Sequence, residues 1–160
     1  MNEKRQQVKQ YLTFNLGTET FAVDVVKTRE ILDMAPVTKV PQTPDEMLGV
    51  INLRNTVVPV IDMRVKFGME AAATSAETCI IVMEVAVDEV PLIVGVRVDA
   101  VQEVIDLDAE QVEPPPRLSA RLKSEFLQGM GKRADGFIMI LDIDKVFSED
   151  EVRLVDAPAR

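Results

Sequence analysis

The sequence predicts an all-β fold with short helices, in which two small barrels arise from a duplicated unit. Apolar residues make up 47% of the 160 residues, aromatic residues only 4%, and Trp is absent. The core must therefore consist mainly of Val, Ile, Leu and Met, and β-branched residues favour strands. Several short runs alternate polar and apolar residues, and three of them recur later in the chain in the same order.

The first sixty residues contain the patterns of four or five short strands. Residues 10–16 alternate with a period of two and end at a turn that begins with Gly17. The same period resumes over residues 21–25, and a further short strand spans residues 30–34 before a proline. Short strands without a long helix are typical of a small barrel.

Residues 50–64 predict a hairpin with a cation at its tip. Two β-rich runs, Val50–Leu53 and Thr56–Ile61, flank the pair Arg54-Asn55. Asn tolerates the left-handed backbone that a two-residue turn requires. Neither a buried strand pair nor a solvated loop readily explains an arginine there. The hairpin is therefore interpreted as a recognition element that presents Arg54 to a partner.

The second half of the chain repeats the first. Three segments have later counterparts: Tyr11–Leu16 in Ile80–Val85, Phe21–Met34 in Val94–Leu107, and Pro59–Met63 in Met139–Ile143. We expect a linker between the copies, near residues 68–78, where small residues gather. The second copy adds an amphipathic helix over Leu118–Leu127, a hairpin turn at Asp135-Gly136, and a terminal helix over Glu149–Val155 that follows a capping box.

Composition disfavours several function classes. A net charge of −9 argues against nucleic-acid binding, and the basic cluster within residues 4–9 is interpreted as a solvated tail. His is absent, so no imidazole can activate a nucleophile or bind a metal, and the single Cys79 is expected to be a buried hydrophobe in a reducing cytoplasm. We predict no cofactor and no metal. A small hydrolase that uses Asp62 and Asp142 is a weaker alternative.

Membrane insertion is not expected from the sequence. There is no signal-peptide pattern at the start, and no apolar run approaches the ~20 residues that a membrane-spanning helix needs. A role at a membrane would therefore require recruitment by another protein.

Five segments together resemble the CheW family of bacterial chemotaxis adaptor proteins: Phe21–Leu32, Leu48–Arg54, Val57–Arg64, Ile93–Val104 and Ile140–Phe147. They span nearly all of residues 10–147 in the family's order. One departure is Asn55, where the family usually has Gly. Because Asn is the best non-glycine residue in the left-handed region, the turn should be retained.

The resemblance implies two intertwined five-stranded barrels of the SH3-like type that share a hydrophobic core. We expect a flexible tail over residues 1–9 and a CheW-like domain over 10–160. Within it, the first barrel covers about residues 15–80 and the second about 81–147, with the first strand and a helix at 148–156 packing across them.

The family resemblance also implies a non-enzymatic adaptor in two-component signal transduction. Such a protein couples the histidine kinase CheA, through its regulatory domain, to the cytoplasmic tips of methyl-accepting receptors. It would be cytoplasmic, recruited to receptor arrays at the inner membrane, and monomeric in isolation. The same adaptor role in a pathway that controls surface motility is an alternative.

Two surfaces follow from this resemblance. The residues expected to face the receptor are Thr28, Glu30, Gly49, Leu53 and Arg54. Glu30 would either orient Arg54 or pair with a base of the receptor. The residues expected to bind the kinase are Asp33, Met34, Val37 and Val40, in a segment stiffened by prolines.

Overall fold

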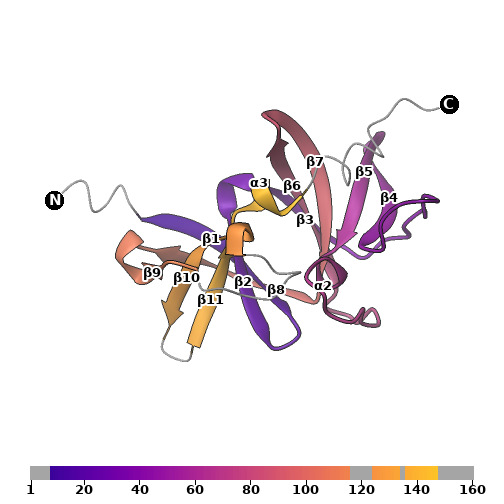
Figure 1. Cartoon of the computed structure of the whole chain (residues 1–160). Helices are drawn as coiled ribbons and strands as arrows, with labels where there is room; N and C mark the ends of the chain where they lie inside the picture. The colour runs from indigo at the N-terminus through magenta and orange to yellow at the C-terminus, as the bar shows by residue number, and fades with distance from the viewer. Residues whose placement is uncertain (1–7, 116–123, 134–135, 148–160) are drawn as a thin grey trace.

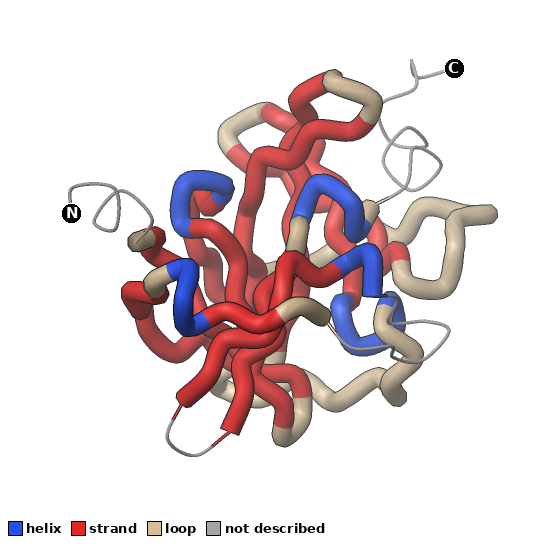
Figure 2. The backbone as a smooth tube through the Cα atoms, turned by 60° about the vertical axis from the view of Figure 1, so that its left-hand side comes forward, coloured by secondary structure: helices blue, strands red, loops and turns tan. Residues whose placement is uncertain are grey.

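The computed structural model describes residues 8–115, 124–133 and 136–147. Their strands form two curved sheets that lie side by side, with short helices at the strand ends (Figures 1 and 2). We call the sheet that contains the Arg54 hairpin the first barrel and the other sheet the second barrel. The predicted all-β class with short helices is confirmed.

The first barrel has five strands. Their spatial order is β3 (Thr28–Asp33), β6 (Cys79–Val87), β7 (Val90–Val98), β5 (Thr56–Asp62) and β4 (Met47–Leu53). The helix α2 (Met63–Lys66) follows β5, and Asp62 caps it by accepting a hydrogen bond from the Arg64 N–H.

The second barrel has six strands, one of them only two residues long. Their spatial order is β8 (Ala100–Leu107), β1 (Lys9–Leu16), β2 (Glu19–Asp24), β11 (Gly136–Leu141), β10 (Leu127–Arg133) and β9 (Val112–Glu113). The short helices of this half of the structure are η1 (Val25–Lys27), η2 (Ala109–Gln111), η3 (Ser124–Phe126) and α3 (Ile143–Val146).

The two copies of the repeat exchange their first hairpins. The hairpin β1–β2 comes from the first copy but lies in the second barrel, and β6–β7 comes from the second copy but lies in the first barrel. The registers agree residue by residue. Tyr11 pairs with Asp24 as Ile80 pairs with Arg97, and these are equivalent positions of the repeat. The duplication therefore holds for strand pairing as well as for sequence.

This exchange moves the expected barrel boundaries. The expected boundary between the barrels lies at about residue 80, whereas β6 and β7 complete the sheet of β3–β5, and β1 and β2 complete that of β8–β11. The reason is the parallel pairing of β5 with β7 and of β11 with β2, since each pair joins strands of different copies. The barrels are thus intertwined more thoroughly than a division into consecutive halves allows.

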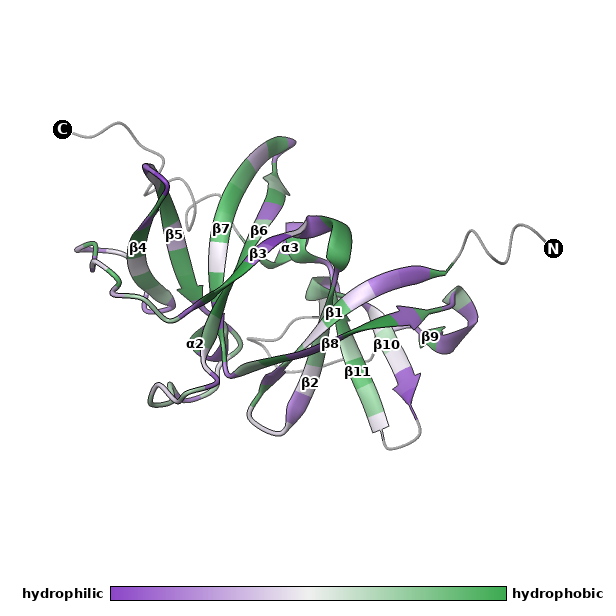
Figure 3. Cartoon of the chain, turned by 180° about the vertical axis from the view of Figure 1, so that it is seen from behind, coloured by the Kyte–Doolittle hydropathy of each residue, from purple (hydrophilic) through white to green (hydrophobic). Residues whose placement is uncertain are grey.

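Buried side chains form three clusters. A small cluster around Val58 and Ile80 fills the first barrel, and another around Ala22 and Ile140 fills the second. The largest cluster lies between the barrels and contains the stacked rings of Phe14, Phe21 and Phe67. Hydrophobic colouring runs along β5 and β7, while the start of β1 is hydrophilic (Figure 3).

Several expected segments lie partly or wholly outside the described residues. The helix expected over Leu118–Leu127 falls partly outside them, and its last residues form η3 and the start of β10. The β10–β11 hairpin is present, but residue 135 of its expected turn lies outside the described part. Residues 1–7 of the tail expected at 1–9 and the terminal helix expected at 148–156 also lie outside it, whereas Lys9 already belongs to β1 because it pairs with β8.

Candidate functional site

The β4–β5 hairpin turns at the two residues that the sequence indicated. Arg54 and Asn55 have φ angles of 51° and 68°, so both adopt the left-handed conformation of a tight hairpin turn. The Asn55 N–H donates to Asn52 Oδ1 at 2.8 Å, which fixes the turn from within. The predicted hairpin is therefore confirmed, with Asn55 in the place where the family usually has Gly.

Arg54 and Glu30 form a bidentate ion pair at this tip. Arg54 Nη1 donates to Glu30 Oε2 at 2.7 Å, and Nη2 donates to Oε1 at 2.9 Å. The Arg54 side chain is 69% exposed and that of Glu30 is 29% exposed. Because a guanidinium has five N–H donors, the pair leaves donors available to a partner. Glu30 therefore orients Arg54, which was the first of its two expected roles.

The ion pair also joins the two edges of the first barrel. Glu30 lies on β3 and Arg54 follows β4, and these are the outermost strands of the sheet. The segment between them adds a second link, since Thr38 exchanges hydrogen bonds of 2.9 and 2.8 Å with Val50. The tip is thus held rigidly although its side chain faces solvent.

The other residues expected at the receptor surface lie around this pair in different ways. Gly49 is buried, and a Cβ there would lie 2.1 Å from the Thr38 carbonyl oxygen, so its role is to admit that segment closely. Leu53 is half-buried against the core of the first barrel. Within the described residues, Thr28 Oγ1 is the buried side-chain atom without a hydrogen-bond partner. Among these five residues, Glu30 and Arg54 are joined by side-chain hydrogen bonds.

The residues expected to bind the kinase follow β3. Asp33 ends that strand and is exposed, while Val40 is half-buried and its carbonyl accepts a bond from Thr43 Oγ1 at 2.9 Å. Met34 and Val37 are half-buried and pack against the core of the first barrel. The four residues lie within residues 33–40, and Thr38 in the same segment forms the link with β4.

Two exposed apolar side chains on the strands of the first barrel were not expected from the sequence. Ile31 follows Glu30 on β3 and is 46% exposed, and Val57 lies at the start of β5 and is 59% exposed. The signal for Ile31 was the alternation of β3, which places it on the opposite face from Glu30 and Leu32.

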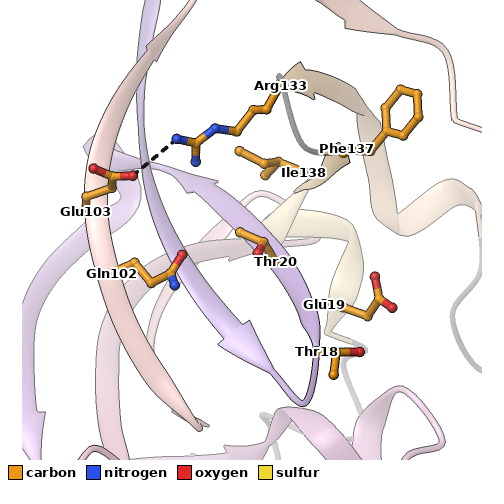
Figure 4. A pocket seen from close by; sticks show the side chains of 9 residues that line it. Thr18, Glu19, Thr20, Gln102, Glu103, Arg133, Phe137 and Ile138 are labelled. Atoms are coloured by element: carbon orange, nitrogen blue, oxygen red, sulfur yellow. Dashed lines mark hydrogen bonds and ion pairs between the residues drawn. The ribbon is translucent and has the colours of Figure 1, made fainter.

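The second barrel carries a counterpart of this ion pair. Glu103 is the repeat equivalent of Glu30, and its carboxylate lies 3.4 Å from Arg133 at the end of β10 (Figure 4). The pair borders a polar pocket of about 490 Å³, and Phe137, which is 54% exposed, lies on its rim. The lining residues are Thr18, Glu19, Thr20, Gln102, Glu103, Arg133, Gly136, Phe137 and Ile138.

The carboxylates of the hydrolase alternative have separate partners. Asp62 is buried, caps α2, and lies 3.4 Å from the buried Arg97, whereas Asp142 lies 3.8 Å from Lys145.

Burial raises the pKa of the Cys79 thiol, which disfavours the nucleophilic thiolate. No group of three or more metal-binding side chains occurs among the residues that the structure covers. Nor does any helix in that part of the chain reach the length and apolarity of a membrane span.

Comparison with known proteins identifies the family. The family model for the CheW-like domain matches residues 10–151. The chemotaxis protein CheW of Klebsiella aerogenes is 37% identical over 95% of this chain and 89% of its own length. The probable chemotaxis protein CheW of Rhizobium etli is 34% identical over 89% of this chain and 90% of its own length.

A solved structure agrees with these sequence matches. The scaffolding protein TtCheW from Thermoanaerobacter tengcongensis superimposes with a TM-score of 0.77. It is 31% identical in sequence, and the match covers 89% of this chain and 94% of the other. The chain therefore belongs to the CheW-like domain family.

Proposed function

We propose that this protein is a non-enzymatic scaffold that couples methyl-accepting chemoreceptors to the histidine kinase CheA in bacterial chemotaxis. The match to the CheW-like domain over residues 10–151 carries this proposal. It is supported by relatives that are named chemotaxis proteins and by a structural neighbour that is named a scaffolding protein. The described surface adds a cation that the ion pair with Glu30 orients.

The receptor would bind at the tip of the first barrel. Arg54 would donate to carboxylates or carbonyls of the receptor's helical hairpin, and Glu30 would hold the guanidinium in the required plane. Preorganisation lowers the entropy lost on binding, because the bidentate pair already restricts the long arginine side chain. Thr28 and Leu53 would border this contact, and Gly49 would support it from inside the barrel.

The kinase would bind along the segment that follows β3. Asp33 and the exposed parts of Met34, Val37 and Val40 would contact the regulatory domain of CheA. The flanking Pro36 and Pro41 restrict the unbound segment, and its link to β4 fixes its path. Receptor and kinase would then occupy two faces of one rigid body, and multivalency in an array would strengthen individually weak contacts.

We also propose where the protein works and in which oligomeric state. The protein would work in the cytoplasm, held at receptor arrays on the inner membrane by its partners, and would be monomeric when isolated. Its assembly with kinase and receptor would be seen as co-sedimentation with receptor-containing membranes only when the partners are present.

Capture by immobilised receptor cytoplasmic fragments tests the receptor surface. Arg54→Glu should abolish capture, because it reverses the presented charge and repels Glu30, while kinase binding is retained. Arg133→Glu is the matched control, since it makes the same change on the equivalent hairpin of the second barrel. Equal capture of wild-type protein and Arg54→Glu would refute the site. Failure of the wild-type protein to bind either partner would refute the function.

A further inference from the structure

Within the described residues, two connections pass from one barrel to the other, and they result from the exchange of hairpins. One runs from β2 through η1 to β3, and the second runs from β7 through Asp99 to β8. Each connection is equivalent to the other under the repeat. An ion pair holds each of them, and the two pairs can be compared directly.

At the second connection, Asp99 is held by Arg64 of α2. Arg64 Nε donates to Asp99 Oδ1 at 2.8 Å and Nη2 donates to Oδ2 at 2.6 Å. The Gly17 N–H, in the turn between β1 and β2, donates to the same Oδ2 at 2.7 Å. The carboxylate thus ties a helix of the first barrel to a turn of the second.

At the first connection, Lys27 is held by Asp144 of α3. Lys27 Nζ lies 2.8 Å from Asp144 Oδ2 and 3.1 Å from Oδ1. The Ala86 N–H, at the end of β6, donates to Asp144 Oδ1 at 2.9 Å. Asp144 is the repeat equivalent of Arg64, and Ala86 is that of Gly17. The same three-part link therefore occurs twice, with the charges of helix and connection reversed.

The Lys27–Asp144 link lies directly before the receptor-facing strand. Lys27 ends η1, and Thr28 begins β3, which carries Glu30 two residues later. Asp144 belongs to the second barrel, while Ala86 and β3 belong to the first. Both side chains of the pair are about one-third exposed, at 34% and 33%. The start of β3 is therefore positioned by a group from the opposite barrel.

We propose that Asp144 is a positioning residue for the receptor surface, because its contacts with Lys27 and the Ala86 N–H fix the start of β3 across the barrel boundary. This inference rests on the proposed function, since it specifies how the fold holds Thr28 and Glu30 for the receptor. The Arg64–Asp99 link holds the other connection and does not touch β3. It should therefore contribute to stability without this effect on binding.

The test uses the full-length protein and three variants. Asp144→Asn keeps an acceptor for the Ala86 N–H but loses the charge that holds Lys27. Lys27→Arg keeps the charge and should preserve binding. Asp99→Asn makes the same neutralisation at the other connection and is the matched control. The measurements are amide hydrogen exchange in the free protein, and affinity for a receptor cytoplasmic fragment.

Asp144→Asn should speed exchange at Thr28–Glu30 and weaken receptor binding by about two- to fivefold, the range expected for a partly exposed ion pair. Asp99→Asn should change neither the exchange rates at Thr28–Glu30 nor the affinity for the receptor fragment. Unchanged exchange at β3 in Asp144→Asn would overturn the inference whether or not the receptor binds. Equal weakening by Asp99→Asn would also overturn it, because the cause would then be general loosening. Failure of the wild-type protein to bind the receptor would instead refute the proposed function.

Discussion

A single methyl group added at Gly49 is expected to destabilise the first barrel strongly. Its φ of +146° lies in a region that side chains rarely adopt, and the new Cβ would lie 2.1 Å from the oxygen and 2.7 Å from the carbon of the Thr38 carbonyl. That carbonyl cannot rotate aside, because Thr38 exchanges two hydrogen bonds with Val50. Backbone strain and overpacking each cost about 1–3 kcal/mol. Gly49→Ala should therefore lower the free energy of unfolding by about 3–5 kcal/mol.

Two other glycines separate these contributions. Gly136 has a φ of +145° but no atom within 4 Å of an added Cβ, so Gly136→Ala introduces the backbone strain without the clash. Gly129 is the repeat equivalent of Gly49, and its φ lies outside the left-handed region. Its added Cβ would nevertheless lie 2.6 Å from the Glu113 oxygen. Gly129→Ala therefore introduces the clash without the strain.

Thermal and urea denaturation followed by circular dichroism would measure the three effects. A loss of 3–5 kcal/mol corresponds to a Tm lower by roughly 8–15 °C in a chain of this size. The Tm values of Gly136→Ala and Gly129→Ala should each lie between that of Gly49→Ala and that of the wild-type protein. If Gly49→Ala melted within about 2 °C of the wild-type protein, the packing argument would be refuted. The packing argument would also be refuted if Gly136→Ala were as unstable as Gly49→Ala.

Three further predictions concern charged and buried groups. The hydrogen bonds from Arg64 hold the pKa of Asp99 below its usual value of 3.8, so the folded chain binds this proton less tightly than the unfolded chain. The free energy of unfolding should then fall as the pH drops below about 5, and Asp99→Asn should flatten part of that fall in urea titrations. Arg97→Met removes the cation beside buried Asp62 and should cost about 2–4 kcal/mol, part of which the added Asp62→Asn change should restore in a double-mutant cycle. Cys79 is 6% exposed and should react with a thiol reagent at pH 8 about 100-fold more slowly in the native protein than in urea, and fast reaction would show that β6 opens.

Local features of the fold could be predicted from the sequence. The alternation of residues 10–16 and the Arg54-Asn55 pair specify a strand and a turn through neighbouring residues alone, and both occur as expected. The repeat was also visible, because equivalent strands bury equivalent positions. The family resemblance added the sites, and the structure brings Glu30 and Arg54 together as a bidentate pair.

The exchange of hairpins could not be read from local patterns. A buried Val-rich strand such as β7 has the same periodicity whichever sheet it joins, so the boundary placed near residue 80 had no local signal against it. The link between Lys27 and Asp144 spans 117 residues, and its equivalent at Asp99 has the opposite arrangement of charges. Sequence symmetry relates Asp144 to Arg64, but it aligns Lys27 with Ala100 and Asp99 with Val26, so it does not pair the two residues that the helices hold.

The exchanged hairpins have a consequence for fragments of the protein. A cut between α2 and β6 would leave two pieces, and each would hold a hairpin that completes the other's sheet. Neither piece could bury its own apolar strands, so each should be unfolded or aggregated by itself, while an equimolar mixture should reassemble. If the two pieces were fused to separate proteins, association of those proteins would bring the pieces together and could be detected as reassembly of the fold.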